Sequence, residues 1–204
     1  MSIEDAHRRL RDLIGDDIEP LASALEVERL RQAWRPEPVR VALLAESHVW
    51  TSAEEASLRV GGEGCAESGF ARFVYCLGYG EPSLVTIAGN RGTPQYWRLF
   101  HDCLDGPDVA FEHLTRKQRD DRLRIQAKQN LLRRMRDAGL WLIDASVTAL
   151  YRSGGRRVSG GVYRRVLQTS WDSHVGQVVG DSRPDALVVI GRNVWNALDR
   201  KSTR

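Results

Sequence analysis

The stretch Val39–Trp50 reads VRVALLAESHVW, and it decides the fold that the sequence predicts. Its first half is a mainly aliphatic run, and two prolines just before it, Pro36 and Pro38, end the preceding helix. The run then breaks into three polar residues, Glu46, Ser47 and His48. Open parallel sheets bind ligands at the carboxyl ends of their strands, so these residues are candidates for a catalytic site. The simpler interpretation is a buried strand followed by an ordinary polar turn.

The length and composition of the chain fit one soluble domain. With 204 residues, of which 42% are hydrophobic and 28% charged, the chain is long enough to bury a full core. No apolar run approaches the roughly 20 residues that cross a bilayer, so no membrane partner is expected. The N-terminal MSIEDAHRRL is charged and lacks the apolar core of a secretory signal, which predicts a cytoplasmic protein.

The cysteines give no sign of a cofactor. Cys65, Cys76 and Cys103 are odd in number and form no CxxC pair, which predicts reduced thiols and neither a zinc nor an iron–sulfur site. Glu46 and His48 have a plausible spacing for a metal, but no second cluster completes the site. Neither a Walker loop nor a GxGxxG turn is present. We therefore expect no cofactor and no metal.

Basic residues gather in the second half of the chain, although the net charge is only +3. One group lies between Arg116 and Arg136, and a second lies between Arg152 and Arg165. Such runs form either a solvated helix face or a patch that contacts phosphates. In the second case, the candidates for contacts to a nucleic-acid backbone are Arg116, Arg119, Arg152, Arg156 and Arg157.

The spacing of apolar residues predicts helices that alternate with buried strands. Helices are expected over residues 3–14, 20–34, 93–104, 115–138, 162–179 and 193–198. Strands are expected over residues 39–44, 140–143 and 186–190. Residues 51–69 predict a long loop with one helical turn, and residues 70–77 fit a strand as well as a helix.

This order predicts an α/β fold. The strands are continuous apolar runs rather than alternating ones, so both faces of the sheet should be covered by helices. We expect a three-layer αβα sandwich with a mainly parallel central sheet. Residues 1–204 form a single domain in this interpretation, with an N-terminal helical pair (1–36) packed on a core (39–198).

Three strand ends can converge in such a sheet: Glu46–His48, Asp144 with its following turn, and Gly191–Asn193. A carboxylate beside a histidine could activate water as a general base. A serine-protease-like triad is disfavoured, because the side chains of Ser47 and His48 diverge on an extended chain and no nucleophile elbow is present.

The motifs LIDASVT (142–148) and DALVVIGRNVWNAL (185–198), together with AESHV (45–49), resemble the uracil-DNA glycosylase superfamily. The resemblance covers residues 39–198 in order. It implies a DNA-repair hydrolase that cleaves the N-glycosidic bond of a base flipped out of DNA. By position, Glu46 matches an acidic residue of the first motif, Ser47 the water-activating residue, and Asp144 the base-reading asparagine.

The resemblance also has gaps. The glycine and proline of the first motif, the four cysteines of the iron–sulfur branch and the last histidine-containing motif are missing, so the chain is either truncated or has lost that motif. His48 would then have to replace the histidine, or the protein only binds DNA. The expected base-binding residues are Asp144, Phe70, Tyr75 and Asn193. Two alternatives stay open: a non-catalytic α/β interaction module, and a hydrolase acting on nucleosides or nucleotides.

Overall fold

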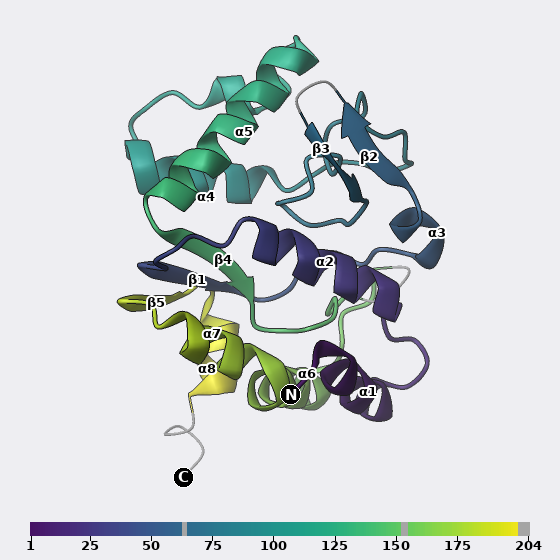
Figure 1. Cartoon of the computed structure of the whole chain (residues 1–204). Coiled ribbons are helices and arrows are strands. Elements are labelled where there is room, and N and C mark those ends of the chain that lie inside the picture. Colours follow the sequence, from purple (N-terminus) through teal and green to yellow (C-terminus); the bar gives the residue numbers. More distant parts are fainter. Residues whose placement is uncertain (63–64, 152–154, 200–204) are drawn as a thin grey trace.

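A three-stranded parallel sheet lies at the centre of the chain, and helices flank it (Figure 1). The computed structural model describes residues 1–62, 65–151 and 155–199. Strands β1 (Val41–Ala45), β4 (Leu140–Asp144) and β5 (Ala186–Val189) pair in the order β4–β1–β5. In this register Ala45 lies opposite Asp144, so the polar residues after β1 begin beside the end of β4. The predicted α/β class and the parallel sheet are confirmed.

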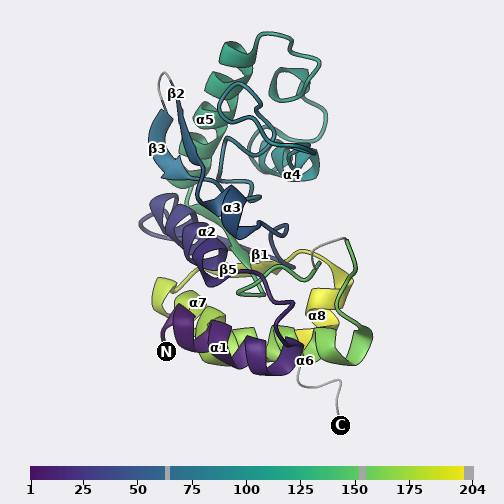
Figure 2. The same ribbon diagram turned by 90° about the vertical axis from the view of Figure 1, so that its right-hand side faces the viewer.

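The helices form two groups on the two sides of the sheet. Helices α1, α6, α7 and α8 gather on one side, and α4 and α5 lie on the other (Figures 1 and 2). Trp141 of β4 donates its indole N–H to the carbonyl oxygen of Arg31 at 2.9 Å, which fixes α2 against the sheet. The helix bounds are α1 Ile3–Ile14, α2 Leu21–Ala33, α3 Ala53–Ala56, α4 Pro94–Asp105, α5 Asp121–Asp137, α6 Gly160–Ser170, α7 Gly176–Ser182 and α8 Arg192–Leu198.

Most of the expected helices occur where the apolar spacing places them. The helix expected over residues 162–179 runs from α6 through a π-helical segment, η2 (Trp171–Val175), into α7. The start expected at Thr115 is wrong. A 3-10 turn, η1 (Glu112–Leu114), precedes α5, and the side chain of Asp120 caps α5 by accepting from the Leu123 amide at 3.1 Å. Leu123, in the first turn of α5, is 51% exposed although it is apolar.

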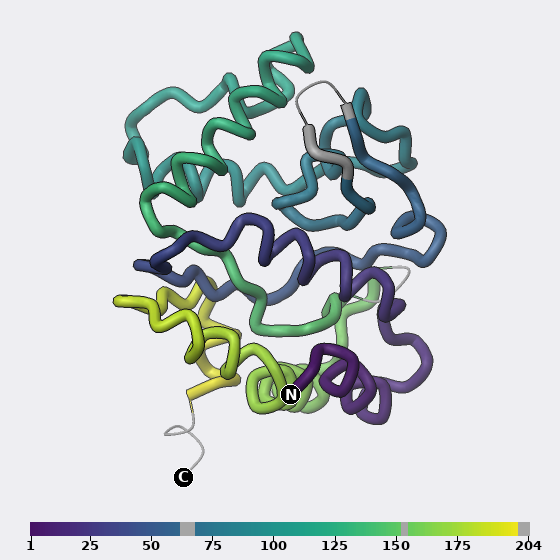
Figure 3. Tube along the Cα trace, in the orientation of Figure 1, coloured from purple at the N-terminus to yellow at the C-terminus, as the bar shows by residue number. Residues whose placement is uncertain are grey.

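The long loop expected over residues 51–69 has more structure than the sequence predicted. The short helix α3 begins with a capping box, in which Ser52 and Glu55 each accept a backbone N–H of the other. An antiparallel hairpin follows, made of β2 (Arg59–Gly62) and β3 (Cys65–Gly69). The residues after it, 70–93, are neither strand nor helix, and their trace winds from the hairpin to α4 (Figure 3).

The expectation that both faces of every strand are covered fails at β5. The central strand β1 and its neighbour β4 are buried, with Leu44 and Leu142 fully inaccessible. Strands β4 and β5 are the two edges of the sheet, and of these β5 is poorly covered, since its Leu187 and Val188 are 40% and 47% exposed. A continuous apolar run reveals that a strand is present but not its place in the sheet. Among the described residues, no helix has the length and apolarity to span a membrane.

Candidate functional site

The ends of β1 and β4 open into a cavity of about 200 Å³, which we call the strand-end cavity. The chain holds the two ends together beyond the ladder, because the Ser146 amide donates to the Glu46 carbonyl at 3.2 Å. The predicted residues Glu46, Ser47, His48 and Asp144 all line this cavity. The structure therefore brings together four residues that the sequence analysis singled out.

His48 lies beneath the cavity as a fully enclosed cation. Its Nδ1 is 3.0 Å from Oδ2 of Asp144, and its Nε2 is 2.6 Å from Oε2 of Glu19. Burial alone would favour the neutral ring, but the charge of Glu19 and the hydrogen bond to Asp144 outweigh it and raise the pKa of His48 to about 9. Both ring nitrogens thus donate at neutral pH, and neither is left for a ligand.

Glu19 is the residue that fixes this histidine from the other side. It comes just before α2 and has no exposed surface. Besides His48, its carboxylate accepts the amides of Thr51 at 3.0 Å and Ala149 at 2.9 Å. One buried carboxylate thereby joins the segment after β1 to the segment after β4.

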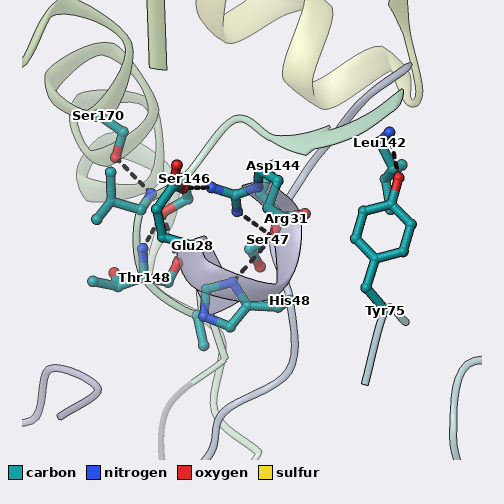
Figure 4. Close-up of polar contacts among 12 residues, drawn as sticks. Glu28, Arg31, Ser47, His48, Tyr75, Leu142, Asp144, Ser146, Thr148 and Ser170 are labelled. Carbon is teal, nitrogen blue, oxygen red and sulfur yellow. Dashed lines mark hydrogen bonds and ion pairs between the residues drawn. The ribbon is translucent and has the colours of Figure 1, made fainter. Parts of the chain in front are cut away.

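Asp144 is buried among charges rather than free to read a base. Its Oδ2 accepts from His48 and also from Nη2 of Arg31 at 3.2 Å, and Arg31 pairs in turn with Glu28 (Figure 4). Burial opposes ionisation of Glu28, but the Arg31 charge prevails and lowers the pKa of Glu28 to about 2. The cluster formally holds two cations, His48 and Arg31, against three carboxylates.

Glu46 is the acidic residue that remains partly open to solvent, with 27% of its side chain exposed. Its Oε1 accepts from the Tyr163 hydroxyl at 2.7 Å and also forms an ion pair with Arg157. Tyr163 and Arg157 line a neighbouring open cavity of about 310 Å³. Glu46 thus lies between the two cavities and is held in place by groups of the second one.

Aromatic rings form part of the wall of the strand-end cavity. Phe73 packs edge-on to His48 with ring centroids 6.3 Å apart, and the Arg31 guanidinium lies 5.7 Å from the centre of the Phe73 ring. Tyr96 lines the cavity as well, and burial together with the charges of Asp144 and Glu46 raises the pKa of its hydroxyl. The Tyr96 hydroxyl therefore stays protonated and can donate a hydrogen bond.

The turn after β4 is held by short polar contacts. The Ser47 hydroxyl accepts the Leu150 amide at 3.3 Å, so Ser47 serves the backbone of this turn. The Ser146 hydroxyl donates to the Thr148 carbonyl at 2.7 Å, and the Ser170 hydroxyl accepts the Val147 amide at 3.2 Å (Figure 4). These bonds fix the turn that follows β4 next to the cavity.

Two of the predicted base-binding residues lie elsewhere. Phe70 is fully buried in the core, where its ring packs edge-on against Tyr79. Tyr75 is also buried, and its hydroxyl accepts the Leu142 amide at 2.8 Å, away from the His48–Asp144 contact (Figure 4). Turns in the segment 70–77 point Phe73 towards the cavity instead of these two rings.

The remaining predicted residues surround the site unevenly. Asn193 lines the neighbouring cavity together with Arg157 and Arg164, and not the strand-end cavity. Arg119 and Arg156 are exposed. Arg116 lines a third cavity, where its Nη2 donates to the Asn90 carbonyl at 2.8 Å. Arg152 lies outside the described residues.

Sequence reasoning missed Glu19, Arg31, Phe73 and Tyr96. Phe73 lies in the same aromatic segment as Phe70 and Tyr75. The sequence therefore indicated this segment, but not which of its rings faces the cavity. Glu19 and Arg31 carry no local signal for this site, because the site residues that they contact lie 29 to 130 residues away in the sequence. Among the described residues, no group of three or more histidine, cysteine or acidic side chains is arranged to hold a metal ion.

No protein-family model, curated protein or solved structure matches the chain. The geometry of the site and the chemistry of its residues are therefore what indicates a function.

Proposed function

We propose that the strand-end cavity receives a nucleobase, and that the chain is a divergent, DNA-binding relative of the uracil-DNA glycosylase superfamily. One observation carries this proposal: Glu46, Ser47, His48 and Asp144 converge on one cavity. Three of these are the positions to which the resemblance assigns base chemistry. The buried contacts of Ser47, His48 and Asp144 fix the two strand ends, and they leave Glu46 as the partly exposed carboxylate of the cavity.

The size and lining of the cavity suit a single planar ring. Its volume of about 200 Å³ is below the ~300–1,000 Å³ of pockets for drug-sized ligands. Tyr96 is half-buried and offers aromatic surface for stacking, and its hydroxyl offers a hydrogen bond. Gln95 adds an exposed amide, which can pair with the donor and acceptor edge of a base.

Basic residues next to the cavity supply the second requirement, contacts to phosphates. Arg157 and Arg164 line the neighbouring open cavity, on the other side of Glu46. A base that leaves a DNA strand stays attached to its phosphates, so a positively charged groove beside the base pocket is the expected arrangement. These basic residues also disfavour a hydrolase for free nucleosides, because such a substrate has no phosphodiester backbone for them to bind.

If the bound base is released, Glu46 is the residue we propose for orienting the attacking water. It is the partly exposed carboxylate of the cavity, and Arg157 and Tyr163 fix its position. His48 cannot act as the missing superfamily histidine, because Asp144 and Glu19 occupy both of its ring nitrogens. Its role is to hold the two strand ends in register.

The test is a titration of labelled single-stranded and mismatched DNA, followed by fluorescence anisotropy at several salt concentrations. We expect binding that weakens steeply with salt, since log K falls by about 0.7 per phosphate contact on a single strand for each tenfold rise in salt. The double variant Arg157→Ala/Arg164→Ala should weaken binding and flatten this slope. Arg9→Ala, an exposed arginine on α1 that lines neither cavity, is the matched control.

Base release is tested separately with DNA that contains uracil or hypoxanthine. If release is detected, Glu46→Gln should abolish it while leaving DNA binding intact, because the amide keeps the size of the side chain and loses its charge. Glu54→Gln on α3, a fully exposed residue, controls for loss of a surface charge. Undetectable DNA binding at low salt would refute the proposed function as a whole.

A further inference from the structure

The third cavity, which Arg116 lines, lies beside the strand-end cavity and has a different charge. It is a cavity of about 200 Å³, which we call the basic cavity. The two cavities flank the first turn of α4: Gln95 and Tyr96 line the first, whereas Pro94 and Trp97 line the second. Thr93 lines both.

The floor of the basic cavity is a buried ion cluster around Glu81, which has no exposed surface. Arg124 donates to the Glu81 carboxylate from Nε at 3.0 Å and from Nη2 at 2.5 Å, and Lys128 Nζ lies 2.5 Å from Oε1. Arg124 also pairs with Asp121 at 2.6 Å. The negative charge of Glu81 is thus fully engaged by its own partners.

Positive charge is in excess around this cluster. Arg91 and Arg116 line the cavity in addition to Lys128, so four cations, counting Arg124, face two carboxylates. Burial lowers the pKa of Lys128, and although Glu81 opposes this, the charges of Arg124 and Arg116 add to the lowering. The ammonium group therefore experiences repulsion from neighbouring cations that an anion in the cavity would relieve.

A buried hydroxyl without a protein partner gives independent support for a ligand site here. Thr93 is only 5% exposed, and its Oγ1 has no hydrogen-bond partner among the described residues. A buried hydroxyl without a partner is unfavourable, so such a group calls for an explanation. Thr93 directly precedes α4, whose positive end favours an anion at the same place.

We propose that the basic cavity binds a phosphoryl group, with Arg91, Arg116 and Lys128 as charged ligands and the Thr93 hydroxyl as a hydrogen-bond donor. Guanidinium groups match the oxygens of a phosphate in pairs, and a nearby ammonium adds a point charge. This inference goes beyond the proposed function, because it needs neither a flipped base nor bond cleavage. The phosphoryl group comes from a free small molecule or from a DNA backbone, and the test separates the two.

The experiment is a calorimetric titration of the full chain with inorganic phosphate. We expect saturable binding at millimolar concentrations, weakened about tenfold or more by Arg116→Ala and several-fold by Thr93→Val. Valine keeps the shape of threonine and removes the hydroxyl. Arg133→Ala, an exposed arginine on α5 that does not line the cavity, is the matched control and should bind phosphate as the wild type does.

Two results would overturn the proposal. One is the absence of phosphate binding to the wild type, and the other is an equal loss in Arg133→Ala and Arg116→Ala, which would mean general attraction by net charge. Thermal unfolding of each variant without ligand verifies that it is folded, and Thr93→Val serves as the second variant if Arg116→Ala is unstable.

A competition experiment identifies the source of the phosphoryl group. If phosphate displaces single-stranded DNA from the wild type but not from Arg116→Ala, the cavity holds a backbone phosphate. If phosphate and DNA bind together, or if phosphate binds and DNA does not, the cavity serves a free phosphorylated molecule. The last result would refute the proposed DNA function and leave the phosphoryl site standing.

Discussion

The strand-end cavity and the basic cavity are neighbours of equal size whose buried ion clusters differ in their balance of charge. Both lie against the first turn of α4, share Thr93 and have a buried ion cluster beneath them. The first cluster sets two cations against three carboxylates, and the second sets four cations against two. Buried ion clusters can therefore have different roles. Around His48 the cluster fixes two strand ends, and around Glu81 it leaves cations facing a ligand.

The largest effect is expected from breaking the first cluster. Glu19→Ala removes the carboxylate that holds His48, Thr51 and Ala149, and it leaves a buried cation with one partner fewer. Loss of one partner of a buried pair costs about 3–5 kcal/mol, so the free energy of unfolding should fall by that amount in urea denaturation. Asp12→Ala, an exposed acid on α1, should change it by less than about 0.5 kcal/mol. An equally small effect for Glu19→Ala would contradict the cluster's structural role.

Breaking the second cluster should cost somewhat less and should couple to phosphate. Glu81→Gln keeps the hydrogen-bond acceptor and removes the charge that Arg124 and Lys128 share, at a cost of about 3 kcal/mol. Because the repulsion among the cations then rises, phosphate should raise the Tm of this variant more than that of the wild type. If phosphate raised the Tm of the wild type more than that of Glu81→Gln, the negative charges of phosphate and of Glu81 would not compete for the same cations.

The third effect is a dependence of stability on pH that belongs to the His48 cluster. A pKa raised from 6.5 to about 9 means that the contribution of the His48 charge is fully present below about pH 6.5 and is lost as the pH rises through 9. The free energy of unfolding should therefore fall by roughly 2–3 kcal/mol over this range. The variant His48→Gln lacks this charge, and its stability should vary less with pH; identical profiles would exclude a buried imidazolium.

The smallest effect separates the two cavities by a single hydroxyl. Tyr96→Phe removes a hydrogen-bond donor from the strand-end cavity and leaves the lining of the basic cavity unchanged. We expect binding of mismatched DNA to weaken about twofold to tenfold, the value of one neutral hydrogen bond, with no change in phosphate affinity. Parallel titrations measure both, and a loss of phosphate affinity would mean that the cavities do not act separately.

Sequence periodicity predicted the sheet and part of the site for a physical reason. Buried strands need continuous apolar runs, and the first polar residue after such a run must lie at the strand end, as Glu46 and Asp144 do. The order of the strands carries no such local signal. The run in β5 resembles the one in β1, and only the fold leaves Leu187 and Val188 exposed at an edge.

The irregular segments explain the rest of the differences. Residues 70–77 have no repeating period, so which aromatic ring points into the cavity depends on turns that composition does not specify. Phe73 contacts His48, whereas Phe70 and Tyr75 pack into the core. Likewise, the basic run could not separate Arg116, which lines a cavity, from Arg119, which does not line it, because long-range packing of residues 80–97 creates that cavity.

The most direct test of the base-binding claim uses DNA with 2-aminopurine at a mismatched position. The fluorescence of this base is quenched by stacking in the duplex, so it reports whether the base leaves the stack when the protein binds. With anisotropy confirming that the DNA is bound, we predict a clear change in 2-aminopurine fluorescence that Tyr96→Phe reduces. Saturated DNA binding with unchanged fluorescence would contradict the account, because the base would then have remained in the helix.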